Sequence, residues 1–206
     1  MIRSHWTGVG SRETPEDILV LMQAIAKKLT DLGWVLRSGG AQGADSAFYA
    51  GCQQSDKFDI NKPFIYLAWN GASGKFHDPS LGIYDASKFD TWEEAEAIAL
   101  ETRGSWLISK DTEMGRGGKA LHTRNIFQVL GEDIDTPSRF LICWALPVGK
   151  LGDRSKVKGG TATATKLAAK HNVEIINLYY PEDFNRCLDF LDKYDVVHSF
   201  IKKGEW

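Results

Sequence analysis

A glycine-rich turn lies in the first quarter of this chain: Ser38-Gly39-Gly40-Ala41-Gln42-Gly43-Ala44-Asp45. It follows a short apolar run, Trp34-Val35-Leu36, and precedes small residues at helical spacing. A strand that ends in such a turn and opens a helix is typical of a phosphate-binding loop. The glycines let the backbone approach an anion closely, and the free N–H groups of the first helical turn point at it. A single turn of this kind is about half the time only a tight connection between two elements.

Two further stretches repeat the pattern, and the repetition favours a ligand-binding role. Gly8-Val9-Gly10-Ser11-Arg12 ends a first predicted strand, and Gly159-Gly160-Thr161-Ala162-Thr163-Ala164 opens a helix in the second half of the chain. The predicted strands lie at 2–9, 34–36, 63–69, 139–144 and 173–178, and predicted helices separate them. Residues 70–90 show little periodicity, so they are predicted to form a long loop.

This alternation predicts an α/β fold with a doubly wound, mainly parallel five-stranded sheet and helices on both faces. If the strand order is 3-2-1-4-5, the first and fourth predicted strands flank the point where the order reverses, which is where such sheets bind ligands. The three glycine-rich turns then meet at one crevice. The length favours one domain over 1–206, with a C-terminal helical segment at about 181–206.

The bulk composition excludes a strongly basic nucleic-acid-binding protein. The formal net charge is −2, and 25% of the 206 residues are charged. Any contact with nucleic acid would depend on a local patch in the predicted loop 145–158, whose basic residues are Lys150, Arg154, Lys156 and Lys158.

No secretory signal is visible, and no apolar run approaches the ~20 residues that span a membrane, which favours a cytoplasmic protein without a membrane partner. Cys52, Cys143 and Cys187 lack metal-binding spacing, so we expect buried, reduced thiols and no metal site.

Several side chains near these turns suit a phosphate-bearing ligand. Arg12 could clamp a phosphate with two parallel hydrogen bonds, although a surface ion pair is an equal alternative. Asp45 could bind a ribose hydroxyl, or it could only favour the helix dipole. Arg124 and Asn125, in a predicted helix at 120–130, could contact phosphate and base or could form a salt bridge on a polar face. The residues predicted to bind nucleotide or phosphate are Gly8, Gly10, Ser11, Arg12, Ser38, Gly39, Gly40, Gly43, Asp45, Arg124, Asn125, Gly159, Gly160, Thr161 and Thr163.

Three other side chains are weaker candidates. His122 lies near Arg124 in the sequence, but a surface position is its commoner role. Trp69 and Trp144 end predicted strands, so either one is placed to stack on a base, while core packing remains the commoner role for tryptophan.

Taken together, these motifs resemble those of the DprA/Smf proteins. The resemblance rests on Gly8-Val9-Gly10-Ser11-Arg12, Ser38-Gly39-Gly40-Ala41-Gln42-Gly43-Ala44-Asp45, Arg124-Asn125 and Gly160-Thr161-Ala162-Thr163-Ala164, in this order. More broadly, residues 3–178 look like the superfamily of Rossmann-like nucleotide-binding domains that includes the LOG phosphoribohydrolases. The resemblance implies a Rossmann-like fold, a crevice for phosphate or nucleotide, and a homodimer. DprA proteins bind single-stranded DNA and load a recombinase, whereas LOG enzymes cleave the base–ribose bond of nucleoside 5′-monophosphates.

The chain departs from both groups in a way that bears on function. The glutamate that follows the glycine-rich loop of LOG enzymes is missing, because residues 159–166 contain no acid. The extra domains and the basic groove typical of DprA proteins have no counterpart in this slightly acidic chain.

The sequence therefore leaves two classes of function open, and neither requires a cofactor. In the first, the chain binds a nucleotide or nucleotide-derived small molecule and hydrolyses its N-glycosidic bond, with Asp45 and Glu113 (or Asp111) as the acids. In the second, it is a non-catalytic module: a DprA-like recombination mediator that binds single-stranded DNA, or a sensor or sink for a nucleotide signal.

Overall fold

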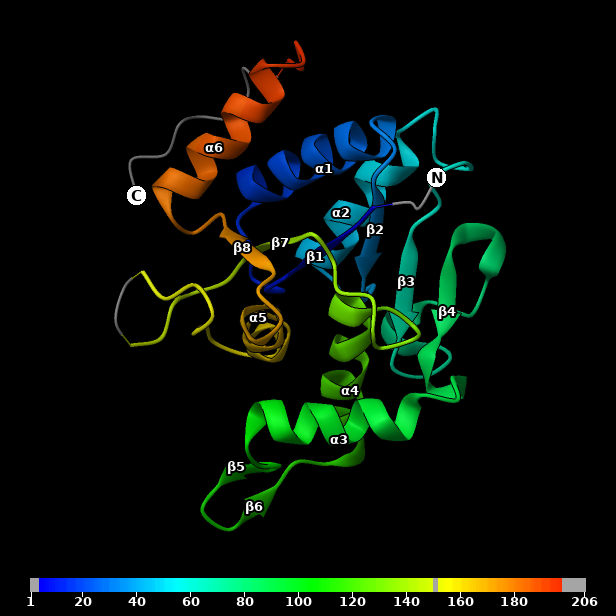
Figure 1. Cartoon of the computed structure of the whole chain (residues 1–206), viewed down its shortest axis with the longest axis vertical. Helices are drawn as coiled ribbons and strands as arrows, with labels where there is room; N and C mark the ends of the chain where they lie inside the picture. Colours follow the sequence, from blue (N-terminus) through cyan, green and yellow to red (C-terminus); the bar gives the residue numbers. More distant parts are fainter. Residues whose placement is uncertain (1–3, 150–151, 198–206) are drawn as a thin grey trace.

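A parallel sheet forms the centre of the protein (Figure 1). The computed structural model describes residues 4–149 and 152–197. The strands of the sheet are β1 (His5–Gly10), β2 (Val35–Ser38), β3 (Phe64–Leu67), β4 (Ile83–Asp85), β7 (Phe140–Trp144) and β8 (Glu174–Asn177). Their order is β4-β3-β2-β1-β7-β8, and every neighbouring pair is parallel.

Helices cover both faces of this sheet and bury a separate apolar core on each. On one face, α1 (Glu16–Asp31), α2 (Ala44–Gln53) and α6 (Pro181–Asp192) pack around Trp6, Leu36 and Phe48. On the other, α3 (Trp92–Arg103), α4 (Arg116–Leu130) and α5 (Thr161–Lys170) pack around Tyr66 and Phe127. A two-stranded hairpin, β5 (Leu107–Ser109) and β6 (Thr112–Glu113), joins α3 to α4 and projects from the body. The architecture is Rossmann-like and doubly wound, as predicted.

The predicted order of the five longer strands is confirmed, but their number is wrong by one. Residues 83–85, inside the stretch predicted as a long loop, pair with β3 at the edge of the sheet, where Tyr84 lies opposite Tyr66. Three residues are too few to show the periodicity of a strand. Short 3₁₀ turns at Ala72–Gly74, Pro79–Leu81 and Ala86–Lys88 account for half of the remaining loop.

Strand order reverses between β1 and β7, and the first two glycine-rich turns meet there. The backbone N–H of Ser11 donates to the carbonyl of Trp144 at 3.0 Å, and that of Ala44 donates to the carbonyl of Ser11 at 3.3 Å. Gly43 has a φ of +78°, and a Cβ at this position would lie 2.6 Å from the Ser11 oxygen. Only glycine fits such a contact. The start of α2 is therefore fixed directly against the end of β1.

The remaining predictions concern the cysteines, membrane-spanning helices and segments that the structure does not describe. The three cysteines are buried, free thiols, as expected, and burial raises the pKa of Cys52 to about 12. Within residues 4–149 and 152–197, no helix has the length and apolar character needed to cross a membrane. Residues 2–3 of the first predicted strand, Lys150 of the basic loop and residues 198–206 of the C-terminal segment lie outside the described residues.

Candidate functional site

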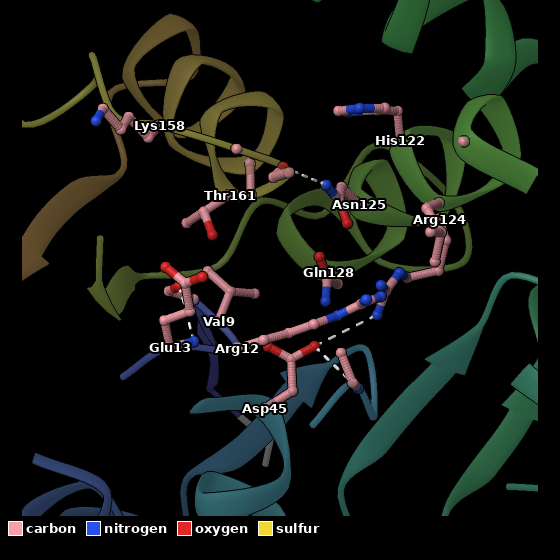
Figure 2. A pocket seen from close by; sticks show the side chains of 18 residues that line it. Val9, Arg12, Glu13, Asp45, His122, Arg124, Asn125, Gln128, Lys158 and Thr161 are labelled. Carbon is pink, nitrogen blue, oxygen red and sulfur yellow. Dashed lines mark hydrogen bonds and ion pairs between the residues drawn. The ribbon is translucent and has the colours of Figure 1, made fainter. Parts of the chain in front are cut away.

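A cavity of about 430 Å³ opens at the carboxyl ends of β1 and β7 (Figure 2). This size lies within the range of small-molecule sites. Its walls come from the turn after β1, the turn before α2, one face of α4 and the first turn of α5. The lining residues are Val9, Gly10, Ser11, Arg12, Glu13, Ala41, Asp45, Gly118, Leu121, His122, Arg124, Asn125, Gln128, Lys158, Gly159, Gly160, Thr161 and Ala164.

The structure brings more than half of the predicted site residues together in this cavity. Those that line it are Gly10, Ser11, Arg12, Asp45, Arg124, Asn125, Gly159, Gly160 and Thr161. The predicted residues that do not line it are Gly8, Ser38, Gly39, Gly40, Gly43, Thr163 and Glu113. The three predicted motifs and the Arg124-Asn125 pair therefore converge, although not every residue within them faces the same space.

Most of the residues outside the cavity support its walls. The Ser38 hydroxyl donates to the Gly8 carbonyl at 2.7 Å, which ties the end of β2 to β1. A Cβ on Gly8 would lie 2.8 Å from atoms of the Phe48 ring, so this glycine makes room for the core. The Gly40 carbonyl accepts a hydrogen bond from Lys75 Nζ at 3.0 Å. These residues hold the glycine-rich turns after β1 and β2 in place without lining the cavity.

A buried ion pair lies on the floor of the cavity. Arg124 Nη1 lies 3.5 Å from Asp45 Oδ2, and the two side chains are only 7% and 5% exposed. The same carboxylate oxygen accepts the N–H of Ala41 at 3.3 Å. Burial raises the pKa of Asp45, and the Arg124 charge opposes this shift. Burial likewise lowers the pKa of Arg124, and the Asp45 charge raises it.

Arg124 has fewer partners than a buried guanidinium normally requires. A guanidinium carries five N–H donors and stays protonated, so each buried N–H needs an acceptor. Arg124 Nε is buried and has no partner among the described residues. The contact with Asp45, at 3.5 Å, is long for a charge-assisted hydrogen bond. Arg124, which lines the cavity, therefore has hydrogen-bonding capacity that its protein partners do not use.

A second arginine approaches the same place. Figure 2 shows the Arg12 side chain extending from the turn after β1 toward the Arg124 guanidinium. The positive charge of Arg12 lowers the pKa of Arg124 further, as expected for two like charges at close range. Across the lining, the cations Arg12, Arg124 and Lys158 outnumber the carboxylates Glu13 and Asp45 by three to two. The cavity therefore has an excess of one positive charge.

Amide side chains connect α4 to the neighbouring turns. Asn125 Nδ2 donates to the Gly160 carbonyl at 2.8 Å. Hydrogen-bond partners fix the orientation of the Gln128 amide: its oxygen accepts from Arg124 Nη1 (3.2 Å) and from the Gly39 N–H (2.8 Å), and its nitrogen donates to Asn125 Oδ1 (2.9 Å). These contacts hold the polar face of α4 against both the glycine-rich turn and α5.

The positive end of α5 completes the wall. The helix begins at Thr161, and its first turn contains no acidic residue that would offset the helix dipole. Gly160 is exposed, and a Cβ built on it would meet no atom within 4 Å. Gly160 is therefore open to the cavity at the positive end of the helix, while the N–H groups of Ala162 and Thr163 already donate to the carbonyls of Gly159 and Gly160.

His122 is a neutral member of the wall rather than a surface residue. Its Nε2 lies 3.0 Å from Arg103 Nη1 and its Nδ1 lies 2.7 Å from Thr163 Oγ1. Since a guanidinium can only donate, Nε2 must accept, and the ring proton lies on Nδ1. Burial, followed by the charges of Arg103 and Arg124, lowers the pKa of His122 to about 4.

We expect His122 to make the stability of the protein depend on pH between about 6.5 and 4. Its pKa is lower in the folded chain than in the unfolded chain, so its contribution is complete above pH 6.5 and is lost as the pH falls toward 4. In urea titrations, the free energy of unfolding of the wild type should fall on the order of 2 kcal/mol more than that of His122→Gln as the pH is lowered over this interval. The exposed His171, changed to Gln, is the matched control. Parallel pH profiles for wild type and His122→Gln would contradict the assignment.

The two acids predicted to act together do not lie in the same site. Glu113 is on the hairpin strand β6, where its Oε1 lies 2.5 Å from Lys119 Nζ, and it does not line the cavity. Asp111, the predicted substitute, is exposed in the same hairpin and does not line the cavity either. The second carboxylate in the lining is that of Glu13, which directly follows the first glycine-rich turn.

Some residues that line the cavity were not predicted, although the sequence pattern indicates one of them. Leu121, Arg124, Asn125 and Gln128 all line the cavity. They follow the spacing i, i+3, i+4, i+7, which places side chains on one face of a helix. Gln128 could therefore have been inferred from Arg124 and Asn125. Glu13 and Ala41 carry no such pattern.

Comparison of the sequence with models of protein families found no match. Searches of curated proteins and of solved structures likewise found no similar protein. The resemblance to DprA and LOG proteins therefore stays a prediction from the motifs alone.

Proposed function

We propose that this protein binds a nucleotide or nucleotide derivative through its phosphate, in the cavity between β1, α4 and α5. The main support is the pair of arginines, Arg12 and Arg124, which line one cavity in which a single buried carboxylate, Asp45, pairs with Arg124. Two guanidiniums this close repel each other, and a phosphate bound between them would remove the repulsion.

The surroundings favour a nucleotide over a bare phosphate ion. The cavity lies where strand order reverses in a parallel sheet, which is the usual position of nucleotide sites in such folds. The amides of Asn125 and Gln128 beside the arginines are already hydrogen-bonded within the protein, but Glu13 and Thr161 add a carboxylate and a hydroxyl to the same lining. Groups of this kind can bind ribose hydroxyls and base edges.

Binding of single-stranded DNA is less well supported by the same structure. The basic loop that would form a DNA groove is largely neutralised by its own neighbours. Arg154 pairs with Asp183 (2.5 Å) and with Glu182 (2.7 Å), and Lys156 pairs with Asp153 (3.1 Å). Of the cations described in this loop, Lys158 is the one that lines the cavity.

The test is calorimetric titration of the protein with ribose 5-phosphate and with the common nucleoside 5′-monophosphates. Arg12→Ala should weaken binding about 10- to 100-fold, because it removes charge-assisted hydrogen bonds to the phosphate. Arg139→Ala is the matched control, because Arg139 is exposed beside the amino end of β7, whereas the cavity lies at the carboxyl ends of the strands.

Two outcomes would contradict the proposal. The first is an unchanged affinity in Arg12→Ala. The second is no binding of any mononucleotide together with binding of an oligodeoxynucleotide that weakens steeply with salt, which would favour the DNA-binding alternative.

Hydrolysis of the bound nucleotide is a separate proposal with one supporting observation. Two carboxylates, Asp45 and Glu13, line the same cavity, as acid–base cleavage of an N-glycosidic bond would require. Chromatographic detection of free base after incubation with each monophosphate tests it, and Glu13→Gln should abolish the release. Tight binding without release would leave the protein as a sensor or sink for its nucleotide.

A further inference from the structure

A second cavity adjoins the first and has a different character. Its volume is about 260 Å³, and it shares Arg12 and Leu121 with the phosphate cavity. The remaining lining residues are Gln42, Trp69, Ala72 and Ser73. It lies where the turn before α2, the end of β3 and the middle of α4 come together.

Trp69 is an unusual tryptophan in this protein. Each of the other tryptophans in the described residues has a neighbouring aromatic ring, with the two ring centroids at most 6.3 Å apart. They are Trp6, Trp34, Trp92, Trp106 and Trp144. Within residues 4–149 and 152–197, Trp69 has no ring partner and no cation over its face. It is also 41% exposed, although an indole normally gains from burial.

The position of the Trp69 ring is nevertheless restricted on one side. It lies against the first turn of α4, where a Cβ built on Gly117 would be 3.8 Å from Trp69 Cη2. This is an ordinary van der Waals distance, so the ring lies close to the backbone of this turn. Trp69 therefore has support from the protein on one side and an open cavity on another.

We infer that this second cavity binds the base of the nucleotide whose phosphate occupies the first, with the base stacked on Trp69. The inference rests on the proposed function. Arg12 lies in both linings, so one ligand can contact it while extending from the phosphate cavity into the second. A planar heteroaromatic ring is the ligand group that suits an open indole face, and stacking on tryptophan tolerates any base.

The polar groups of the second cavity fit the edge of a base. Gln42 offers an amide with both donors and an acceptor, and Ser73 offers a hydroxyl. Both residues are exposed, so they can exchange water for a ligand without leaving a buried group unpaired. A purely apolar occupant would leave these groups without partners.

The experiment compares adenosine 5′-monophosphate with ribose 5-phosphate, which lacks the base. The wild type should bind the nucleotide about tenfold more tightly than ribose 5-phosphate. Trp69→Leu should lose about tenfold in affinity for the nucleotide and nothing for ribose 5-phosphate, because leucine keeps apolar bulk but cannot stack. Trp69→Tyr should retain most of the nucleotide affinity. Phe76→Leu is the matched control, since Phe76 is 65% exposed and lines neither cavity.

The outcomes separate this inference from the proposed function. If Trp69→Leu binds the nucleotide as well as the wild type does, or loses affinity for both probes equally, the base site is wrong while phosphate binding stands. If the wild type binds neither ribose 5-phosphate nor any nucleoside 5′-monophosphate, the proposed function fails and the base site fails with it. Quenching of tryptophan fluorescence by the nucleotide, present in wild type and lost in Trp69→Leu, would be independent support.

Discussion

Replacing Asp45 with alanine is expected to lower the free energy of unfolding by about 3–5 kcal/mol. Arg124 is buried and has its carboxylate partner in Asp45. Without that partner the guanidinium is left with the neutral Gln128 oxygen and the nearby positive charge of Arg12. An arginine cannot escape this state by losing its proton. Urea denaturation monitored by circular dichroism measures the change.

Replacing Arg124 instead of Asp45 should destabilise the protein less. Arg124→Met leaves Asp45 buried without its cation, but a carboxyl group can take up a proton, and burial already raises the pKa of Asp45. The double variant Asp45→Ala/Arg124→Met removes both charges and should recover much of the stability lost in Asp45→Ala. A double variant no more stable than Asp45→Ala would show that the loss came from packing rather than from an unpaired charge.

Gly39→Ala is expected to reduce the affinity for phosphate-bearing ligands by at least about 100-fold. A Cβ on Gly39 would lie 1.0 Å from Arg124 Nη1 and 2.1 Å from Arg124 Cζ, so the guanidinium must leave its position. The same Cβ would lie 2.4 Å from the Gln128 amide oxygen that accepts the Gly39 N–H, so this amide must move as well. The substitution removes Arg124 from the cavity although residue 39 itself does not line it.

Titration with ribose 5-phosphate, together with the far-UV circular dichroism spectrum, separates lost binding from lost structure. Gly115→Ala is the matched control: its φ is −66°, and a Cβ there would meet no atom within 4 Å. It should bind as the wild type does. If Gly39→Ala bound ribose 5-phosphate as tightly as the wild type does, Arg124 would contribute nothing to ligand binding.

The fold could be predicted from the sequence where local signals agree. Continuous apolar runs, helical periodicity and glycine-rich turns all indicated the same alternation, and the strand order supposed for such a sheet is the one observed for the five longer strands. The edge strand β4 could not be predicted, because Ile83, Tyr84 and Asp85 are held by pairing with β3 and not by any pattern of their own. The hairpin of β5 and β6 escaped for a similar reason, since both strands are short and exposed.

The site was predictable at the level of motifs and less so at the level of residues. A glycine that makes room for a ligand and a glycine that makes room for a side chain look the same in a sequence. Gly39 lies against Arg124 and Gly8 lies against Phe48, so both serve the protein's own packing. Glu113 lies in a polar, glycine-rich stretch of sequence, and this stretch forms the hairpin and the first turn of α4 rather than a wall of the cavity.

Helix α4 carries one row of side chains that faces the cavity and another row that faces the core. Leu121, Arg124, Asn125 and Gln128 face the cavity, while Ile126, Phe127, Val129 and Leu130 are buried in the core. Substitutions along the first row would change the chemistry of the cavity without touching the second row. An insertion or deletion of one residue is different, because it turns everything beyond it by about 100° and takes both rows out of register with the cavity and the core. The chemistry of the cavity can therefore change by substitution, whereas the length of α4 before residue 121 must stay in step with the sheet.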